Sequence, residues 1–216
     1  MPKLERSIFS RHEPQVLAAL RGSTVGIAGA GGLGSNAAIA LARAGIGRLI
    51  VADFDKVEPS NLNRQQYTVK QIGRRKVAAL KANLAQIAPF TRCTAHDVKI
   101  TPANIGRVFG GADLLIEAFD KAAEKGMLIN SWLKLYPGKP VVAASGLAGY
   151  GGNSKLRTRK MGNLYICGDG ASEPAPGVSP MAPRVALVAG MQANLAVELL
   201  MKVKKGVRNV QDQPVF

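Results

Sequence analysis

Residues 29–35 read Gly-Ala-Gly-Gly-Leu-Gly-Ser, a glycine-rich stretch between two apolar segments. It follows the apolar run Thr24-Val-Gly-Ile-Ala28, which is typical of a buried strand, and it precedes Ala and Leu residues at helical spacing. A glycine-rich turn from a strand into a helix N-terminus is an anion-binding site, because its backbone N–H groups point at the ligand. Gly29 allows the tight turn, Gly31 lets the backbone approach a phosphate, and Gly34 lets helix and strand pack closely.

An acidic residue follows the next strand at the distance expected for nucleotide binding. The apolar run 48–52 ends at Asp53, which lies 53 − 34 = 19 residues after Gly34, where a ribose-binding acid is expected. The chain is therefore predicted to bind a nucleotide, and a glycine-rich turn without a ligand is the structural alternative. A nicotinamide-dependent oxidoreductase would show the same residues, so they leave the functional class open.

The segment after Asp53 separates these classes. Residues 53–67 read Asp-Phe-Asp-Lys-Val-Glu-Pro-Ser-Asn-Leu-Asn-Arg-Gln-Gln-Tyr, a long polar stretch where a dehydrogenase would usually turn quickly into its next helix. Asn61 and Arg64 can hydrogen-bond to phosphate or sugar, and the planar guanidinium of Arg64 suits phosphoryl oxygens. Nothing in the sequence supplies an obvious hydride-transfer acid, so an oxidoreductase is the less favoured class.

With these motifs the chain resembles the ThiF/MoeB family of adenylating enzymes, which are relatives of the ubiquitin-activating enzymes. Within that family it is most similar to the short ThiF-type adenylyltransferases of thiamine sulfur carriers. The resemblance covers about residues 11–205, and it is carried by Gly29-Ala-Gly-Gly-Leu-Gly34, Asp53-Phe-Asp55, Ser60-Asn-Leu-Asn-Arg-Gln65, Ile72-Gly73, Lys76 and Asp120.

The resemblance implies an ATP-dependent enzyme that activates the C-terminal glycine carboxylate of a small ubiquitin-like sulfur carrier ending in Gly-Gly. The implied ligands are ATP and Mg²⁺, and the implied ATP-binding residues are Gly29, Gly31, Gly32, Gly34, Asp53, Asp55, Asn61, Arg64 and Lys76. Arg64 and Lys76 would neutralise triphosphate charge, and Asp120 would hold Mg²⁺. Arg11 would reach the ATP of the partner in a homodimer.

Several alternatives stay open at this point. Lys76 could lie on a solvated helix face, and Asp120 could simply cap a helix. The acceptor could instead be a molybdopterin-type carrier or the threonylcarbamoyladenosine of a tRNA.

Alternating strand and helix patterns predict one α/β domain with a Rossmann-like, mostly parallel sheet flanked by helices. The nucleotide-binding half covers about 22–145 and the carrier-binding half about 146–205. Strands are expected at 24–28, 48–52, 91–96, 113–117 and 140–144, with helices at 14–20, 33–44, 74–88, 102–109, 122–135 and 184–204. Residues 155–159 and 163–167 are expected to add an antiparallel pair at the sheet edge. The Gly- and Pro-rich segment 168–183 is expected to be a functional loop.

The 216-residue chain is strongly basic, with 29 basic and 14 acidic residues and a formal charge of +15. Such a field attracts an acidic protein partner or a polyanion, although a solvated basic surface is equally compatible. Nucleic acid is the less favoured partner, because aromatic residues make up only 5% of the chain and do not interleave with basic ones. Basic residues gather at Arg74-Arg-Lys76, at Lys155, Arg157, Arg159 and Lys160, and at Lys202, Lys204, Lys205 and Arg208.

Two cysteines, Cys93 and Cys167, are too few for a disulfide framework or a four-cysteine zinc site, so zinc is not expected. Cys167 is interpreted as a buried structural thiol. His12 and His96 are isolated. No signal peptide and no apolar run of membrane-spanning length are recognised, which predicts a cytoplasmic protein without a membrane partner.

Overall fold

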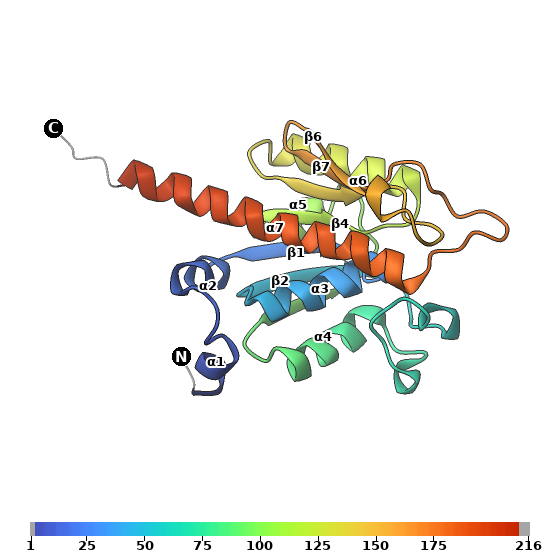
Figure 1. Ribbon diagram of the computed structural model, residues 1–216, viewed down its shortest axis with the longest axis horizontal. Helices are drawn as coiled ribbons and strands as arrows, with labels where there is room; N and C mark the ends of the chain where they lie inside the picture. The colour runs from blue at the N-terminus through green and yellow to red at the C-terminus, as the bar shows by residue number, and fades with distance from the viewer. Residues whose placement is uncertain (1–2, 212–216) are drawn as a thin grey trace.

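The computed structural model describes residues 3–211, with side chains described for residues 3–202. Its centre is a seven-stranded sheet in the order β3-β2-β1-β4-β5-β7-β6 (Figure 1). The strands are β1 (Thr24–Ala28), β2 (Arg48–Asp53), β3 (Arg92–Asp97), β4 (Leu114–Glu117), β5 (Val141–Ala144), β6 (Arg157–Met161) and β7 (Leu164–Gly168). Only β6 runs against its neighbour. The predicted Rossmann-like sheet with an antiparallel strand pair is confirmed.

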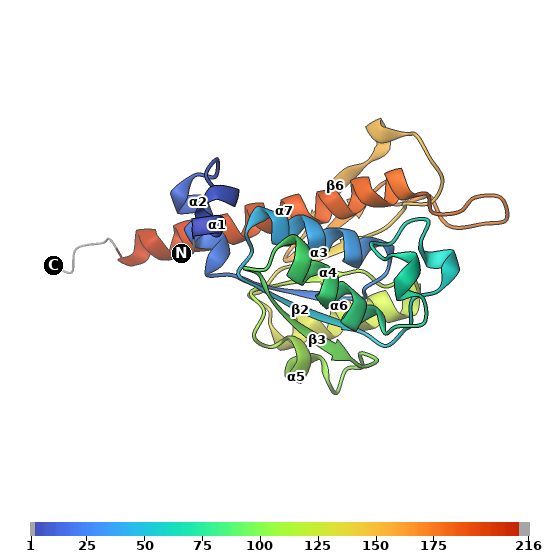
Figure 2. The ribbon, with the colours of Figure 1, turned by 90° about the horizontal axis from the view of Figure 1, so that it is seen from below.

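Helices cover both faces of this sheet, so its central strands are buried on both sides (Figure 2). The helices are α1 (Lys3–Ile8), α2 (Pro14–Arg21), α3 (Gly32–Ala44), α4 (Lys76–Ile87), α5 (Ile105–Phe109), α6 (Ala122–Leu135) and α7 (Ala182–Gln211). Helices α3, α4 and α7 share one hydrophobic core with the sheet, and α5 and α6 share the other. The short helix α1 was not predicted, because its polar sequence shows no apolar period. It is held by a buried ion pair between Glu5 and Arg21.

The glycine-rich turn has the geometry that its sequence predicts. Gly29 has a φ of 99°, and a Cβ on it would lie 2.7 Å from the Ala118 carbonyl oxygen. A Cβ on Gly34 would lie 1.8 Å from the Gly29 carbonyl oxygen, which no side chain could tolerate. The turn therefore requires glycine at both positions to bring α3 against β1 and β4.

The expected start of the strand at residue 155 needs correction. Lys155 lies in a 3-10 turn, Asn153–Lys155, and β6 begins only at Arg157. Positive φ angles at Gly151 and Gly152 turn the chain there and delay the strand. The basic residues Lys204, Lys205 and Arg208 lie outside the described side chains.

The expectation that no apolar run reaches membrane-spanning length is also corrected. Residues Ala182–Lys202 of α7 are long and apolar enough by length and composition, with a mean hydropathy of 1.3. Half of that stretch is buried inside the protein, where α7 packs on α3, as expected for a core helix.

Candidate functional site

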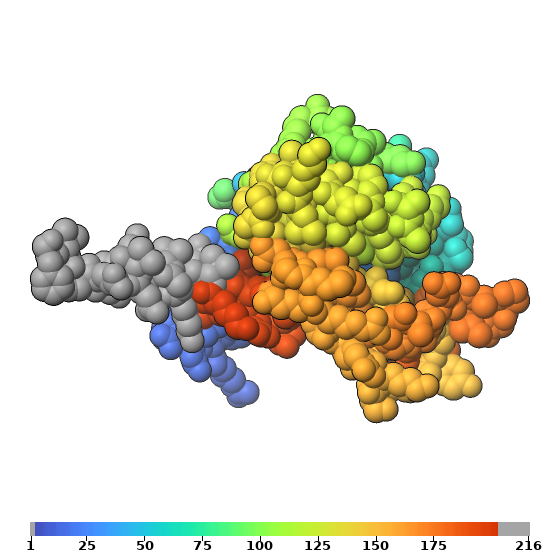
Figure 3. Space-filling model, turned by 90° about the horizontal axis from the view of Figure 1, so that it is seen from above, coloured from blue at the N-terminus to red at the C-terminus, as the bar shows by residue number. Residues whose placement is uncertain are grey.

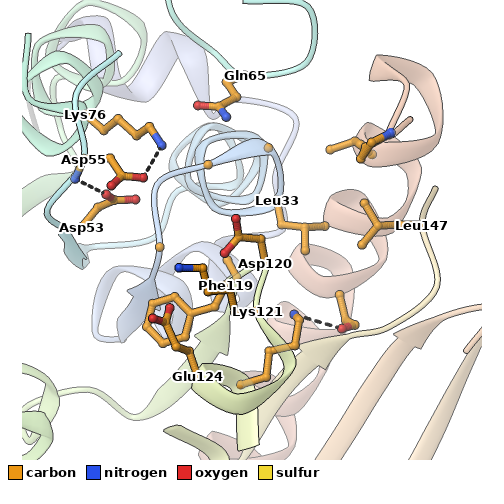
Figure 4. A pocket seen from close by; sticks show the side chains of 18 of the residues that line it. Leu33, Asp53, Asp55, Gln65, Lys76, Phe119, Asp120, Lys121, Glu124 and Leu147 are labelled. Atoms are coloured by element: carbon orange, nitrogen blue, oxygen red, sulfur yellow. Dashed lines mark hydrogen bonds and ion pairs between the residues drawn. The ribbon is translucent and has the colours of Figure 1, made fainter. Parts of the chain in front are cut away.

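A cleft of about 730 Å³ opens at the carboxyl ends of the parallel strands (Figure 4). Its lining comes from the glycine-rich turn, the ends of β2, β4 and β5, the polar segment 53–65 and the start of α6. Ligands bind at this edge in doubly wound sheets, and the volume is within the roughly 300–1,000 Å³ of small-molecule sites. Every ATP-binding residue implied by the resemblance lines this cleft except Gly34, which is packed against Gly29.

The N-terminus of α3 provides an open anion site on one side of the cleft. Gly31 is the N-cap residue, and no described side chain hydrogen-bonds to the N–H groups of the first turn. A Cβ on Gly31 would meet no atom closer than 3.8 Å, so the space above the turn is free. The backbone can therefore accept a phosphate, which the helix dipole also favours.

Asp53 fixes the turn and faces the cleft at the end of β2. Its Oδ2 accepts a hydrogen bond from the Ala30 N–H at 2.6 Å, and its Oδ1 accepts one from the Asp55 N–H at 2.7 Å. Burial raises the pKa of Asp53, and these two backbone hydrogen bonds oppose that effect. Each carboxylate oxygen keeps a lone pair, so the group can still accept from the ribose hydroxyls of a nucleotide.

Lys76 is not on a solvated helix face, because it is only 7% exposed and forms an ion pair inside the cleft. Its Nζ lies 2.8 Å from Asp55 Oδ2, and Asp55 itself is half exposed. The Lys76 N–H also donates to the Asp55 carbonyl at 2.9 Å, so the start of α4 is fixed to the segment after β2. Because these contacts fix Lys76, its ammonium is already positioned at the cleft before a ligand binds.

Asn61 and Arg64 take part in the local structure of the polar segment. Asn61 is buried, and its Oδ1 accepts from the Glu58 N–H at 3.1 Å, which caps the 3-10 turn Pro59–Asn61. Arg64 is half-buried, and its Nη1 donates to the Ser60 carbonyl at 3.1 Å and to Asn63 Oδ1 at 2.8 Å. Both residues line the cleft. Among the described residues only Ser60 and Asn63 accept from the Arg64 guanidinium, so its other N–H groups can donate to a ligand.

Asp120 is exposed and projects into the middle of the cleft in Figure 4. It does not cap α6, because the N-cap position belongs to Lys121. The described residues contain no cluster of three or more His, Cys, Asp or Glu side chains that could hold a metal unaided. Asp120 nevertheless suits Mg²⁺, which commonly takes one or two carboxylates and completes its shell with phosphate oxygens and water.

A buried ion pair below the cleft was not predicted. Glu117, the last residue of β4, is fully buried, and Lys125 Nζ lies 3.0 and 2.8 Å from its two carboxylate oxygens. Burial raises the pKa of Glu117, and the Lys125 ammonium opposes that effect. Lys125 also donates to the Ala144 carbonyl at 3.2 Å, so it joins α6 to the ends of β4 and β5. The only sign of this ion pair in the sequence is that the apolar run of β4 ends in an acidic residue.

A second unpredicted ion pair anchors the segment 168–183, which projects from the body as a loop (Figure 3). Asp169 accepts hydrogen bonds from the Ala171 and Ser172 N–H groups at 2.8 Å and pairs with Arg184 at 2.5 Å. Burial alone would raise the pKa of Asp169, but hydrogen bonds from Ser172 and Ala171 and the Arg184 charge hold it at about 2. Arg184 also donates to the Gly151 carbonyl, which ties both loops to the start of α7. Ser172, Glu173, Pro174 and Pro180 of this loop line the cleft.

Two sequence candidates lie away from the cleft. Arg11 is exposed between α1 and α2 and is not among the residues that line this chain's own cleft. These two helices lie at the opposite end of the sheet from the loop 168–183 (Figure 1). Cys167 is buried, with its Sγ 3.7 Å from Thr158 Oγ1, and burial raises the pKa of its thiol. The interpretation of Cys167 as a buried thiol is confirmed.

Comparison with known proteins identifies the family to which this chain belongs. The family model described as "ThiF family" matches residues 4–213. The chain belongs to the ThiF family. The predicted ThiF/MoeB resemblance is thereby confirmed, and the open helix N-terminus, Asp53 and Lys76 are features of a ThiF-family cleft in this chain.

Curated relatives share this part of their sequence with the chain. It is 32% identical over 202 residues to the adenylyltransferase and sulfurtransferase uba4 of Emericella nidulans, covering 87% of this chain and 42% of that protein. It is 38% identical over 132 residues to the tRNA threonylcarbamoyladenosine dehydratase of Bacillus subtilis, covering 58% of this chain and 52% of that protein. The chain spans between about a quarter and a half of the length of such relatives.

Solved structures show the same fold at lower sequence identity. The E. coli tRNA N6-threonylcarbamoyladenosine dehydratase in complex with ATP matches with a TM-score of 0.84 and 22% identity, over 96% of this chain and 98% of that chain. E. coli MccB with AMPCPP and MccA matches with a TM-score of 0.67 and 22% identity, over 87% of this chain and 58% of that chain.

Proposed function

We propose that this ThiF-family chain is an ATP-dependent adenylyltransferase that activates a carboxylate as an acyl-adenylate. The observation that carries the proposal is the convergence of three features in one cleft: an open helix N-terminus at Gly31, a buried cation at Lys76 and a free carboxylate at Asp120. The names of the curated relatives, adenylyltransferases among them, and the ATP complex of a structural neighbour support it.

The reaction would need positioning and charge neutralisation more than acid–base chemistry. A carboxylate oxygen attacks the α-phosphorus of ATP, a P–O bond forms, and the bond to the departing pyrophosphate breaks. The attacking group is already an anion, so no base has to remove a proton. The turn at Gly31 would hold phosphate oxygens, Asp53 would orient the ribose, and Lys76 and Arg64 would offset the charge that moves to the pyrophosphate. Asp120 would hold Mg²⁺, which supplies further charge neutralisation at the phosphates.

The acceptor in this proposal is the C-terminal glycine carboxylate of a small ubiquitin-like sulfur carrier, with the thiamine-type carrier as the specific candidate. A carrier tail would approach between the loop 168–183 and the basic strand β6. The exposed side chains of Arg157 and Arg159 give that edge a charge that suits an acidic partner. The proposal also includes a homodimer in which the partner supplies Arg11, and a cytoplasmic location.

A second acceptor is favoured by two specific observations. The solved dehydratase chain is covered over 98% of its length, whereas the solved MccB chain is covered over 58%. The chain's net charge of +15 also suits a tRNA. A threonylcarbamoyladenosine group carries a carboxylate, so the same cleft could activate it. Adenylation that depends on a glycine-tailed carrier supports the first acceptor, and dependence on modified tRNA supports the second.

The nucleotide choice is tested by titrating ATP with Mg²⁺ and, separately, NAD while following thermal unfolding. Because a ligand that binds only the folded state stabilises it, we expect ATP to raise the unfolding temperature more than NAD does. Asp53→Ala should cost about 1–3 kcal/mol of ATP binding, because ribose hydroxyls lose a charged acceptor.

Asp97 is the matched control for this experiment. It is the register partner of Asp53 on the neighbouring strand β3, forms an exposed pair with Arg75 and lies outside the cleft. Asp97→Ala should leave ATP binding unchanged. Stronger stabilisation by NAD than by ATP would contradict the proposed adenylation.

A further inference from the structure

Gln65 is a cleft residue whose buried side chain is not used by the fold. The residue is 8% exposed and lines the cleft next to Arg64. Its Oε1 is buried without a hydrogen-bond partner, and its Nε2 donates to no described residue. An unpartnered buried oxygen costs stability, so the placement of this amide in the cleft needs an explanation.

The amide of Gln65 lies over the phosphate-binding turn. A Cβ placed on Gly31 would be 3.8 Å from Gln65 Nε2, and this nitrogen is the nearest atom in that direction. In Figure 4 the amide lies above the turn, and Asp120 lies below the turn, towards the middle of the cleft. A group seated on the N-terminus of α3 would therefore come within reach of the Nε2 donors.

The backbone on both sides of Gln65 is fixed to the same turn. Asn36 Nδ2 donates to the Arg64 carbonyl at 3.0 Å, and the Gln66 N–H donates to Ser35 Oγ at 3.1 Å. The Tyr67 hydroxyl donates to the Ala30 carbonyl at 2.6 Å. Since these three contacts hold residues 64–67 against the start of α3, the Gln65 amide is positioned in advance of any ligand.

Gln65 differs in this respect from the two cations beside it. Lys76 is engaged by Asp55, and Arg64 is engaged by Ser60 and Asn63. The Nε2 of Gln65, which lies over the turn, donates to no described residue and keeps both of its N–H groups for a ligand. We propose that Gln65 is a phosphate-binding residue, whose Nε2 donates a hydrogen bond to an oxygen of the ATP triphosphate seated on the glycine-rich turn. This inference rests on the proposed ATP site.

The test compares Gln65→Met with Gln66→Met. Gln66 is the matched control, because it is the exposed neighbour and its Nε2 is already used by Asn36 Oδ1 at 2.7 Å. Because the lost hydrogen bond is to a charged group, we expect Gln65→Met to weaken ATP binding about 10- to 100-fold, measured by calorimetric titration without an acceptor. Gln65→Glu should weaken it at least as much, since it loses the donor and adds a negative charge beside the phosphates. Gln66→Met should bind ATP as the wild type does.

Thermal unfolding of the ligand-free proteins separates a phosphate contact from a structural role. Methionine fills similar space and removes the unpartnered buried Oε1, so ligand-free Gln65→Met should unfold at the wild-type temperature or above it. Two results would overturn the proposal: ATP binding by Gln65→Met within about twofold of wild type, or a lower unfolding temperature of the ligand-free variant accompanying the weaker binding. Failure of carboxylate adenylation in the wild type would be a separate outcome, because this titration needs no acceptor.

Discussion

Lys76→Met is expected to slow adenylate formation by about two to three orders of magnitude, the loss typical of removing one preorganised charge stabiliser. The Lys76 side chain is almost fully buried, so water cannot readily replace its positive charge at the phosphates. Its charge matters most when the bond to pyrophosphate breaks, so turnover should fall more than ATP affinity. Arg64→Ala should act in the same direction with a smaller effect, because Arg64 is more exposed and already donates to Ser60 and Asn63.

Single-turnover formation of the adenylate at saturating ATP measures this effect directly. Lys81→Met is the matched control, because Lys81 is an exposed lysine on the same helix, α4, and lies outside the cleft. We expect the control to react at the wild-type rate. A normal rate for Lys76→Met would show that the cation has no role in the reaction.

Asp169→Ala is expected to lower the free energy of unfolding by about 3–5 kcal/mol, because it leaves the Arg184 charge buried and unpaired. The side chains of this pair are only 7% and 5% exposed. The control is Glu198→Ala on α7, which removes an ion pair with Lys202 whose side chains are 51% and 67% exposed. An exposed helical pair of this kind is worth about 0.3–0.5 kcal/mol.

Denaturant unfolding at neutral pH measures both variants. The pH dependence gives an independent check, because the pKa of Asp169 is about 2 in the folded protein and 3.8 ordinarily. A lowered pKa means that this stabilisation is present above pH 3.8 and is lost as the pH falls towards 2. An Asp169→Ala variant as stable as Glu198→Ala at neutral pH would contradict this account of the loop anchor.

Local sequence was sufficient to predict the geometry of the glycine-rich turn and the position of Asp53 at the end of β2. The turn at Gly29–Gly34 is dictated by sterics within a few residues, and Asp53 sits at a fixed distance along the next strand. Parallel strands bring their carboxyl ends to one edge, so Lys76 and Asp120 could be assigned to the same cleft once the family resemblance was recognised.

The ion pairs around the cleft could not be predicted in the same way. Glu117 pairs with Lys125, and Asp169 pairs with Arg184. These partners come together only when strand ends, loops and helices pack in the folded chain, and no periodic sequence pattern predicts such contacts. The unpartnered amide of Gln65 is likewise visible only when the packing around the turn is known. The distance of Arg11 from the cleft could not be predicted either. It results from the packing of α1 and α2 at the end of the sheet away from the cleft.

Exchange of labelled pyrophosphate into ATP is the decisive measurement for the proposed adenylation, because it reports reversible formation of an acyl-adenylate. The wild-type protein should be assayed with Mg²⁺ and either a glycine-tailed ubiquitin-like carrier or a tRNA that bears threonylcarbamoyladenosine. We expect exchange that requires one of these two carboxylate acceptors and that falls by about two to three orders of magnitude in Lys76→Met. No exchange with either acceptor, from a protein that binds ATP, would rule out the proposed adenylation.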